Sequence, residues 1–370
     1  MIWYQAAPLS DASSCSSSSS SSAEGNIEGY EQYVIARHYR ERCNRTLQQR
    51  EASPIIHLKK LHDWIKENLI RMCTCKGDKV IDIACGKGSD IPKWHKVEAR
   101  LYIGVDIVES SLQQARKRYN EVTTMSPGRA LTTHNNSSYV RRWGHHPTQR
   151  GYQNSSDTKT AGTKSFAARF LCADCFTHSL RARVAAEAPE GAVGSFDVCS
   201  CQFALHYAWC SAGRARATLA SVAGLLKPGG FFFGTIPDSE VILSRLRSSP
   251  TAFSGQFGNK IYRIKFDATQ RAKALRCWEE PYGIQYEFHL LDAVDHCPEW
   301  LVPFQELQNL AHEYGFELLL RKNFQEFVRE HMQAPNLAKL MHKLGAPGNI
   351  SQEEWECVSI YLVFIFRKRG

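Results

Sequence analysis

The stretch VIDIACGKGSD (residues 80–90) joins a short apolar segment to two closely spaced glycines. Residues 80–85 predict a buried β-strand, and Gly86 and Gly88 predict a turn that leads into a helix. Glycine in such a turn lets the backbone approach a ligand, and the following helix offers free N–H groups. The stretch lacks the third glycine of the dinucleotide fingerprint, which disfavours a nicotinamide cofactor.

Short apolar runs and helical stretches alternate after this turn. Strands are expected at LYIGVD (101–106), RFLCAD (169–174), FDVCSCQF (196–203) and within GLLKPGGFFFGTIP (224–237), with a helix in ESSLQQARKRYNE (109–121). Buried strands separated by helices predict an α/β fold with a mostly parallel sheet and right-handed crossovers.

The chain changes character on both sides of this region. Residues 30–70 show apolar positions at helical spacing. FGNKIYRIKF (257–266) and YGIQYEFHL (282–290) predict antiparallel strands, CPEWLVPFQELQNLAHEYG (297–315) a helix entered through proline, and residues 316–324 and 358–368 further strands.

Two segments do not fit this pattern. Residues 1–29 are rich in serine and are expected to form a disordered leader, because they have little to bury. Residues 123–165 are polar and basic, and predict a low-complexity surface insertion between a helix and a strand. The folded domain is therefore expected to span residues 30–370.

Composition narrows the classes of function. The net charge of +9 and an isoelectric point near 8.9 favour an anionic partner such as nucleic acid. No apolar run has the ~18–20 residues of a membrane helix, and the N-terminus lacks a secretory pattern. The 13 cysteines are odd in number, and Cys172 and Cys175 form a lone C-x-x-C pair. Reduced thiols and no metal site are expected.

Two acidic residues follow strands that are expected to end at the same edge of the sheet. Asp106 is placed to accept hydrogen bonds from both hydroxyls of a ribose, and Asp174 to meet an adenine amino group. Together with the glycine turn they resemble the S-adenosylmethionine site of Rossmann-like methyltransferases, and the helix, Pro-Gly-Gly turn and strand of residues 224–237 support this likeness. Helix capping by both acids is the alternative.

Five segments together resemble the eukaryotic mRNA cap (guanine-N7) methyltransferases. These are CGKGSDIPKW, DVCSCQFALHY, FGNKIYRIKF, CPEWLVPF and SIYLVFIF, and the likeness runs from about residue 30 to the C-terminus except for the polar insertion. It implies a seven-stranded, mostly parallel sheet, with about residues 248–302 forming a small antiparallel insertion on the cap side. It also implies a nuclear enzyme acting on capped RNA, with other capping enzymes or the RNA polymerase II machinery as partners.

The resemblance also assigns residues to ligands. S-adenosylmethionine would contact Lys66, Gly86, Asp106, Asp174, Gln202 and Tyr207. The cap phosphates would face Lys87, Lys93 and Arg118, and the guanine His206, Tyr207, Glu299 and Tyr361, with His62 and Asp63 as further cap contacts. Ala84 stands where the family usually has glycine; alanine is compatible with this position if it keeps a negative φ, and cofactor binding is then expected to change only slightly.

The chemistry of the cap agrees with these residue types. A carboxylate such as that of Glu299 accepts from both N1–H and the exocyclic amine of guanine, a pair of donors that adenine lacks. Guanine N7 carries a lone pair and no proton, so positioning suffices and no catalytic acid or base is predicted. A methyltransferase for a small molecule or a protein, and a non-catalytic RNA-binding scaffold, remain the alternatives.

Overall fold

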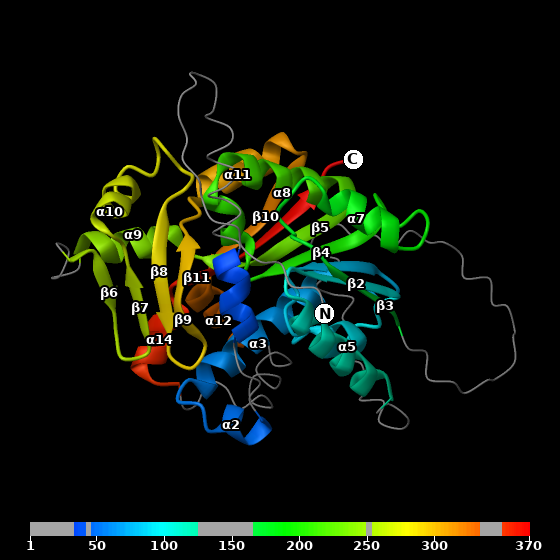
Figure 1. Ribbon diagram of the computed structural model, residues 1–370, viewed down its shortest axis with the longest axis horizontal. Helices are drawn as coiled ribbons and strands as arrows, with labels where there is room; N and C mark the ends of the chain where they lie inside the picture. Colours follow the sequence, from blue (N-terminus) through cyan, green and yellow to red (C-terminus); the bar gives the residue numbers. More distant parts are fainter. Residues whose placement is uncertain (1–32, 42–45, 125–165, 249–253, 334–349) are drawn as a thin grey trace, which may run out of the picture.

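A seven-stranded sheet forms the centre of the protein (Figure 1). The computed structural model describes residues 33–41, 46–124, 166–248, 254–333 and 350–370. The strands are β1 (Lys79–Ile83), β2 (Leu101–Asp106), β3 (Ala167–Cys172), β4 (Phe196–Gln202), β5 (Leu226–Pro237), β10 (Phe316–Asn323) and β11 (Tyr361–Lys368). Their order is β10-β11-β5-β4-β1-β2-β3. Strands β1 to β5 run parallel, and β11 is antiparallel to both its neighbours.

The central strands are apolar because both faces of the sheet are covered. Every residue of β2 is buried, and Ile81 of β1 pairs with Ile103 of β2 and Cys199 of β4. Strands buried on both faces read as continuous apolar runs, which is why the sequence located them to within a few residues. The predicted mostly parallel α/β fold is confirmed.

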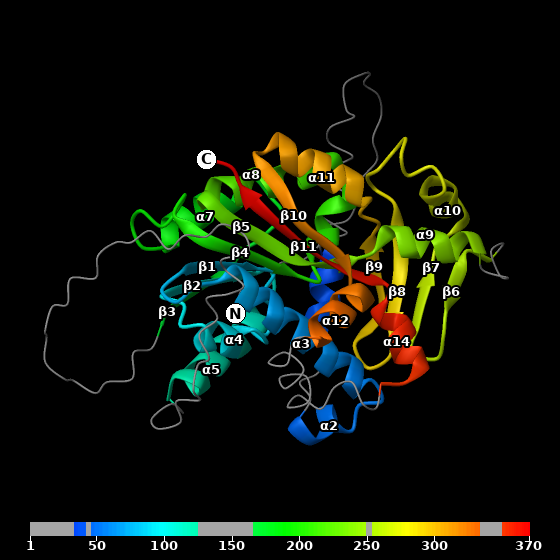
Figure 2. The same ribbon diagram turned by 180° about the vertical axis from the view of Figure 1, so that it is seen from behind.

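Helices cover the two faces of the sheet and enclose two apolar cores (Figures 1 and 2). Helices α3 (Ile56–Cys73), α4 (Ile91–Lys96), α5 (Glu109–Thr124) and α12 (Phe324–Met332) lie on one face. Helices α7 (Leu180–Glu187), α8 (Ala212–Leu225) and α11 (Phe304–Glu313) lie on the other. Residues 33–41 are also helical, and α2 (Leu47–Glu51) precedes α3.

The start of α3 is held by a residue from the far end of the chain. Glu354 of α14 (Gln352–Val358) accepts hydrogen bonds from Leu58 N at 3.0 Å and from Ser351 N at 2.9 Å. The N–H groups of a first helical turn have no partner within the helix, so the buried Glu354 stabilises α3 directly.

A second, four-stranded antiparallel sheet lies beyond one end of the large sheet (Figures 1 and 2). It contains β6 (Gln256–Gly258), β7 (Tyr262–Lys265), β8 (Gln285–Leu290) and β9 (Val294–Trp300), with α9 (Ser239–Ser248) and α10 (Ala268–Ala274) beside it. It falls within residues 248–302, where the sequence predicted an antiparallel insertion. Residues 257–266 form two strands rather than one, because Asn259 accepts a hydrogen bond from Ile261 N and turns the chain.

The segment CPEW (297–300) is a strand and not, as the sequence suggested, the beginning of a helix. Glu299 pairs with Tyr286 and Trp300 with Gln285, so these residues complete β9. Helix α11 starts at Phe304, directly after Pro303. A helix that began at residue 297 would contain Pro303 in its interior, where proline cannot supply the N–H group that the helix needs. The strand conformation is what turns Glu299 inward.

Two predicted segments lie largely outside the described residues. The serine-rich residues 1–29 are among them, as is the insertion 123–165 except for its first two residues, which form the end of α5. Among the described helices, none combines the length and the apolar character needed to cross a membrane.

Ala84 does not meet the condition under which alanine was expected to fit its position. It follows β1 with a φ of 56°, in the left-handed region, rather than with a negative φ. The backbone is forced there because Ala84 N donates to Cys175 Sγ at 3.1 Å and Cys85 N to Val105 O at 3.0 Å. An L-residue with a side chain is strained by about 1–2 kcal/mol in this conformation.

Replacing Ala84 by glycine should therefore stabilise the protein. We expect Ala84→Gly to raise the free energy of unfolding by about 1 kcal/mol and the melting temperature by about 2 °C, measured by calorimetry. The matched control is Ala186→Gly on the exposed face of α7, which should lower stability by about 1 kcal/mol. Equal losses for both variants would contradict the strain at Ala84.

Candidate functional site

A cavity of about 910 Å³ opens where the carboxyl ends of β1 to β4 meet the antiparallel sheet. Parallel strands in adjacent register bring their following loops to one edge, which is the usual ligand site of open α/β sheets. The cavity wall contains the residues predicted from the sequence with the exception of Lys93: Lys66, Gly86, Asp106, Asp174, Gln202, Tyr207, His62, Asp63, Lys87, Arg118, His206, Glu299 and Tyr361.

Asp106 fixes the loop that follows β1. Its carboxylate accepts hydrogen bonds from Gly86 N at 2.8 Å and from Val108 N at 2.9 Å. Burial raises the pKa of Asp106, and the two backbone donors oppose that rise. Gly86 has a φ of 53°, and a Cβ at this position would meet nothing within 4 Å. The loop thus presents open backbone to the cavity beside a well-oriented acid.

Asp174 lies two residues beyond β3 and is already engaged. It accepts from Phe176 N at 2.9 Å and from Arg214 Nη2 at 3.1 and 3.0 Å. Arg214, on α8, is buried and lines the cavity. Arg214 could not be predicted as a cavity residue, because SAGRARATL has the composition of an exposed basic helix. Asp174 therefore binds its helix and loop neighbours while still facing the cavity.

Gln202 is the last residue of β4, and Tyr207 lies a few residues beyond it. Gln202 Oε1 accepts from Thr235 Oγ1 at 3.2 Å, and its Nε2 donates to Ser200 Oγ at 3.2 Å. The hydroxyl of Tyr207 hydrogen-bonds that of Tyr39 at 2.8 Å. Tyr39 comes from the helical residues 33–41, so this helix contributes to the wall.

Two lysines and two aspartates form a charge-balanced cluster under the cavity. Lys66 Nζ lies 2.9 Å, and Lys93 Nζ 2.8 Å, from the Asp90 carboxylate. Asp63 Oδ1 is 3.3 Å from Lys66 Nζ and 3.1 Å from Lys93 Nζ. Burial disfavours the charged form of Asp90, but Lys66 and Lys93 outweigh it and hold the pKa of Asp90 well below its ordinary value.

This cluster explains why Lys93 does not reach the cavity wall. Its ammonium group is held between Asp63 and Asp90, and only 9% of its side chain is exposed. Lys93 was predicted to face the cap phosphates because it is a basic residue in the segment that follows the glycine turn. The sequence does not indicate that Asp63 and Asp90 pair with it in the folded protein. Asp63, by contrast, lines the cavity with half of its side chain exposed.

Three cations lie on the same side of the cavity. Arg118 donates to Lys87 O at 2.9 Å, and both side chains line the wall. Burial and the charge of Arg50 lower the pKa of Arg118, so Arg50 adds to the same positive field. Arg50, which also lines the cavity, was not predicted, because residues 30–70 were analysed only as a helical segment.

The opposite end of the cavity contains a buried acid beside a buried histidine. Glu299 Oε2 accepts from Tyr286 Oη at 2.9 Å, and Oε1 lies 3.6 Å from His206 Nε2. Burial raises the pKa of Glu299 to about 8, a rise that the Tyr286 bond opposes. Burial also lowers the pKa of His206 to about 3. Neither ring nitrogen of His206 finds a hydrogen-bond partner within the described chain.

Aromatic rings complete this end. Tyr361 lies at the start of β11. The centroid of its ring is 5.1 Å from that of Phe203 and 5.3 Å from that of His62, and both pairs have an edge-to-face arrangement. Burial, aided by Lys66, lowers the pKa of His62 to about 3, so this ring is neutral. Phe203 was missed although it directly follows Gln202. Tyr286 was missed as well, yet its inward position follows from the alternation in YEFHL.

These features define the class of protein. A glycine turn after β1, an acid at the end of β2 and a cavity at the carboxyl edge of a β10-β11-β5-β4-β1-β2-β3 sheet are those of a Rossmann-like class I methyltransferase.

The chain belongs to the mRNA (guanine-N7)-methyltransferase family. It matches the family's methyltransferase domain over residues 22–135 and 145–369. It is 44% identical to the mRNA cap guanine-N(7) methyltransferase 1 of Oryza sativa subsp. japonica, over 91% of this chain and 81% of that protein. The protein of the same name from Arabidopsis thaliana is 41% identical, over 99% of this chain and 91% of that protein. The mRNA cap guanine-N(7) methyltransferase of Schizosaccharomyces pombe is 32% identical, over 92% of this chain and 84% of that protein.

Solved structures similar to this chain include an S-adenosylmethionine-dependent methyltransferase from Mesorhizobium loti. The match has a TM-score of 0.41 and 15% sequence identity, and covers 84% of this chain and 100% of that one. A second solved structure, from Listeria monocytogenes, matches with a TM-score of 0.43 and 11% sequence identity. That match covers 85% of this chain and 99% of the other.

The charge cluster predicts unequal effects for its two acids. Asp90→Asn would leave two buried ammonium groups with only Asp63 as an ionic partner, and should destabilise the protein by about 3 kcal/mol. Asp63→Asn should cost less than about 1 kcal/mol, because half of Asp63 is exposed to solvent. Denaturant titrations at constant m-value measure both. Similar losses for the two variants would show that burial of Asp90 is not decisive.

Proposed function

We propose that this chain transfers a methyl group from S-adenosylmethionine to N7 of the terminal guanosine of GpppN-capped RNA. Membership of the cap methyltransferase family supports the proposal. The observation that carries it is the pair of Glu299 and His206, which face one another 3.6 Å apart in the cavity wall, both buried and both with hydrogen-bonding capacity to spare.

The opposite half of the cavity suits the methyl donor. Asp106 presents a carboxylate fixed by two backbone N–H groups, in the position that binds a ribose in this class of fold. Gly86 leaves the adjoining backbone open, and Lys66 lies nearby as a partner for a carboxylate. When bound, S-adenosylmethionine supplies a methyl group attached to a positively charged sulfur. Asp174, Gln202 and Tyr207 complete the proposed donor site.

Glu299 and His206 would select guanine. An ionised Glu299 accepts two hydrogen bonds from N1–H and the exocyclic amine, whereas adenine offers a bare N1 there. His206 is neutral, because its pKa is lowered to about 3, and a neutral imidazole can donate to the guanine carbonyl. Unpaired buried groups penalise the wrong base more than they reward the right one. Tyr361 supplies an aromatic surface for the purine.

The cationic side of the cavity would hold the triphosphate bridge. Lys87, Arg118 and Arg50 gather there, and charge-assisted contacts to phosphate are the strongest hydrogen bonds available to a protein. Lys93, which is held between Asp63 and Asp90, would not contact the phosphates directly. The net charge of +9 supports the attraction of a polyanion.

No residue needs to remove a proton in this reaction. Guanine N7 attacks through its lone pair, so the chain contributes by aligning the base and by excluding water. Glu299, which is held by Tyr286, would fix the purine edge. His206 has a lowered pKa and is therefore not an imidazolium that could give up a proton near neutral pH. We propose that transfer requires no metal ion, that the protein acts in the nucleus, and that other capping enzymes or the RNA polymerase II machinery are its partners.

A methylation assay tests the proposal. The purified chain is incubated with labelled donor and with RNA ending in GpppA, ApppA or an uncapped triphosphate, in the presence of a chelator. We expect label only on the guanosine cap, at N7 after nuclease digestion. Label at another position would favour a methyltransferase for a different substrate. Donor binding without transfer to any RNA would favour a non-catalytic role.

The raised pKa of Glu299 predicts that cap binding depends on pH. The carboxylate form, which guanine requires, becomes populated only as the pH rises through about 8. The association constant for an unmethylated cap dinucleotide should therefore rise roughly tenfold per pH unit well below the pKa and level off above it. Fluorescence titrations between about pH 6 and 8.5 measure this.

Glu299→Gln is the matched control, because glutamine has the same shape and cannot ionise. Its cap affinity should not change with pH, and above pH 8 it should fall about 10- to 100-fold below that of the unchanged protein. Affinity for S-adenosylmethionine, measured by calorimetry, should be unaffected. An equal loss of donor and cap affinity would remove Glu299 from the guanine site.

A further inference from the structure

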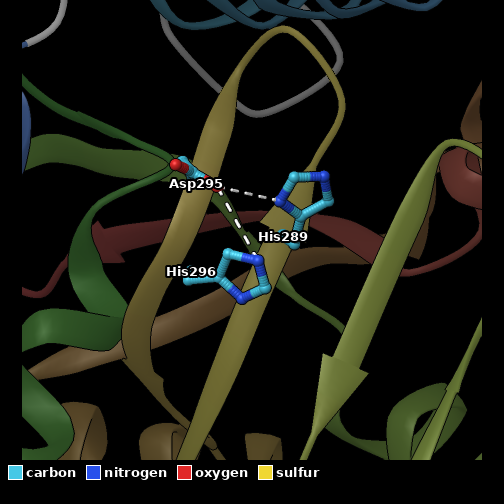
Figure 3. A group of neighbouring side chains, drawn as sticks. All are labelled: His289, Asp295 and His296. Carbon is cyan, nitrogen blue, oxygen red and sulfur yellow. Dashed lines mark ion pairs between the residues drawn. The ribbon is translucent and has the colours of Figure 1, made fainter.

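The β8–β9 hairpin contains a bulge that brings three side chains with metal-binding atoms together. Phe288 pairs with Cys297 and Leu290 with Val294, so that the single residue His289 on β8 faces both Asp295 and His296 on β9. In a regular strand, successive side chains point to opposite faces. An extra residue re-aims one of them, and Figure 3 shows the Asp295 carboxylate facing the rings of both histidines.

The backbone at this bulge is strained. His296 has a φ of 46°, in the left-handed region that costs a residue with a side chain about 1–2 kcal/mol. Strain of this kind is retained only where the surrounding structure requires it, and it concentrates at ligand sites. Here its effect is to place His296 on the same side as Asp295 and next to His289, with the two rings 4.9 Å apart.

The nitrogen and oxygen atoms of the three side chains converge. One ligand atom from each residue lies within 4.8 Å of the other two. Asp295 Oδ1 is 3.3 Å from His289 Nδ1 and 3.8 Å from His296 Nε2. Ligands bound tetrahedrally to zinc at about 2.0–2.2 Å lie about 3.3–3.6 Å apart. Shifts of roughly 1 Å would therefore close the site.

Two further observations favour a metal over a simple ion-pair cluster. Glu287 Oε1 lies 2.9 Å from His296 Nδ1, and the histidines that bind metals commonly donate their second N–H to a carboxylate in this way. That bond leaves Nε2 of His296 directed towards Asp295. In addition, His289 Nδ1 is buried, and no described residue gives it a hydrogen bond of acceptable geometry.

We propose that His289, Asp295 and His296 form a binding site for a divalent transition metal of the zinc class. Two imidazoles and one carboxylate are the borderline ligands that Zn²⁺ prefers, whereas Mg²⁺ and Ca²⁺ prefer oxygen alone. Three protein ligands leave a coordination position for water or an anion.

The site lies at the mouth of the cavity and not at the methyl-transfer centre. His289 and Asp295 are part of the cavity wall, and the hairpin turn is anchored by Asp292, whose Oδ2 accepts from Ser53 Oγ at 2.7 Å. A bound metal would cross-link β8 to β9, the strand that contains Glu299. The proposal does not depend on the proposed function, because metal binding can be measured without substrate.

Zinc binding to the purified full-length chain tests the proposal directly. A chromogenic zinc indicator competes with the protein for ZnCl₂, and we expect one tight site per chain. Affinity should fall at least tenfold in His289→Ala, in Asp295→Asn and in His296→Asn, and about tenfold in Glu287→Gln. Asp295 is 81% exposed, and asparagine tolerates a positive φ, so two of these variants should fold normally.

The matched control is His312→Ala, which removes an exposed histidine on α11. It should bind zinc as well as the unchanged chain. X-ray absorption at the zinc edge should show nitrogen and oxygen neighbours, with no sulfur at about 2.3 Å. A sulfur shell would assign the metal to cysteines and overturn the proposal. So would unchanged affinity in Asp295→Asn and His296→Asn, or an equal loss in His312→Ala.

Discussion

The site depends on a single carboxylate that joins two loops at the edge of the sheet. Asp106 accepts hydrogen bonds from Gly86 N and Val108 N, and so ties the turn after β1 to the end of β2. The parallel pairing of these strands brings the two loops together, and the carboxylate fixes the path of the turn together with the bonds from Ala84 N to Cys175 Sγ and from Cys85 N to Val105 O. Because this acid is buried and doubly bonded, it faces the cavity in one orientation, and the rest of the donor half is arranged around it.

The two halves of the cavity use buried charge in opposite ways. On the donor side, Lys66 and Lys93 are balanced by Asp63 and Asp90, so the charges cancel before any ligand arrives. On the guanine side, Tyr286 is the one donor to Glu299 among the residues that the structure describes. A balanced cluster contributes rigidity, whereas an unsatisfied buried group contributes discrimination, since the correct ligand is the one that satisfies it. The protein thereby combines a rigid donor half, built on the Lys66–Asp90 cluster, with a guanine half in which Glu299 discriminates between bases.

Much of the fold could be predicted from the sequence, because buried strands leave long apolar runs and loops leave glycines. Asp106 and Asp174 were found because each directly follows one of these apolar runs. What could not be found depends on tertiary contacts: the position of Lys93 between two acids, the partnership of Arg214 with Asp174, and the left-handed φ of Ala84. No local pattern reports which side chain meets another across the sheet.

The segment around residues 297–300 shows the limit most clearly. Its proline and acidic residue suggested the start of a helix, but pairing with β8 makes it a strand. The bulge next to it escaped prediction as well, because an extra residue in one strand is visible only when the partner strand is known. Both features decide which way a functional side chain points. The sequence therefore predicted which residues form the candidate site better than it predicted their orientations and partners.

The last part of the sequence also carries a consequence for how the molecule is made. Strand β11 inserts between β5 and β10, it begins with Tyr361, and Glu354 just before it holds the start of α3. A chain leaving the ribosome can assemble β1 to β4 before β11 appears, because all four strands end by Gln202. The purine-facing wall must wait for residues 351–368. Until they emerge, the edges of β5 and β10 that β11 covers stay open to unwanted partners, and the chain is exposed to aggregation during that interval.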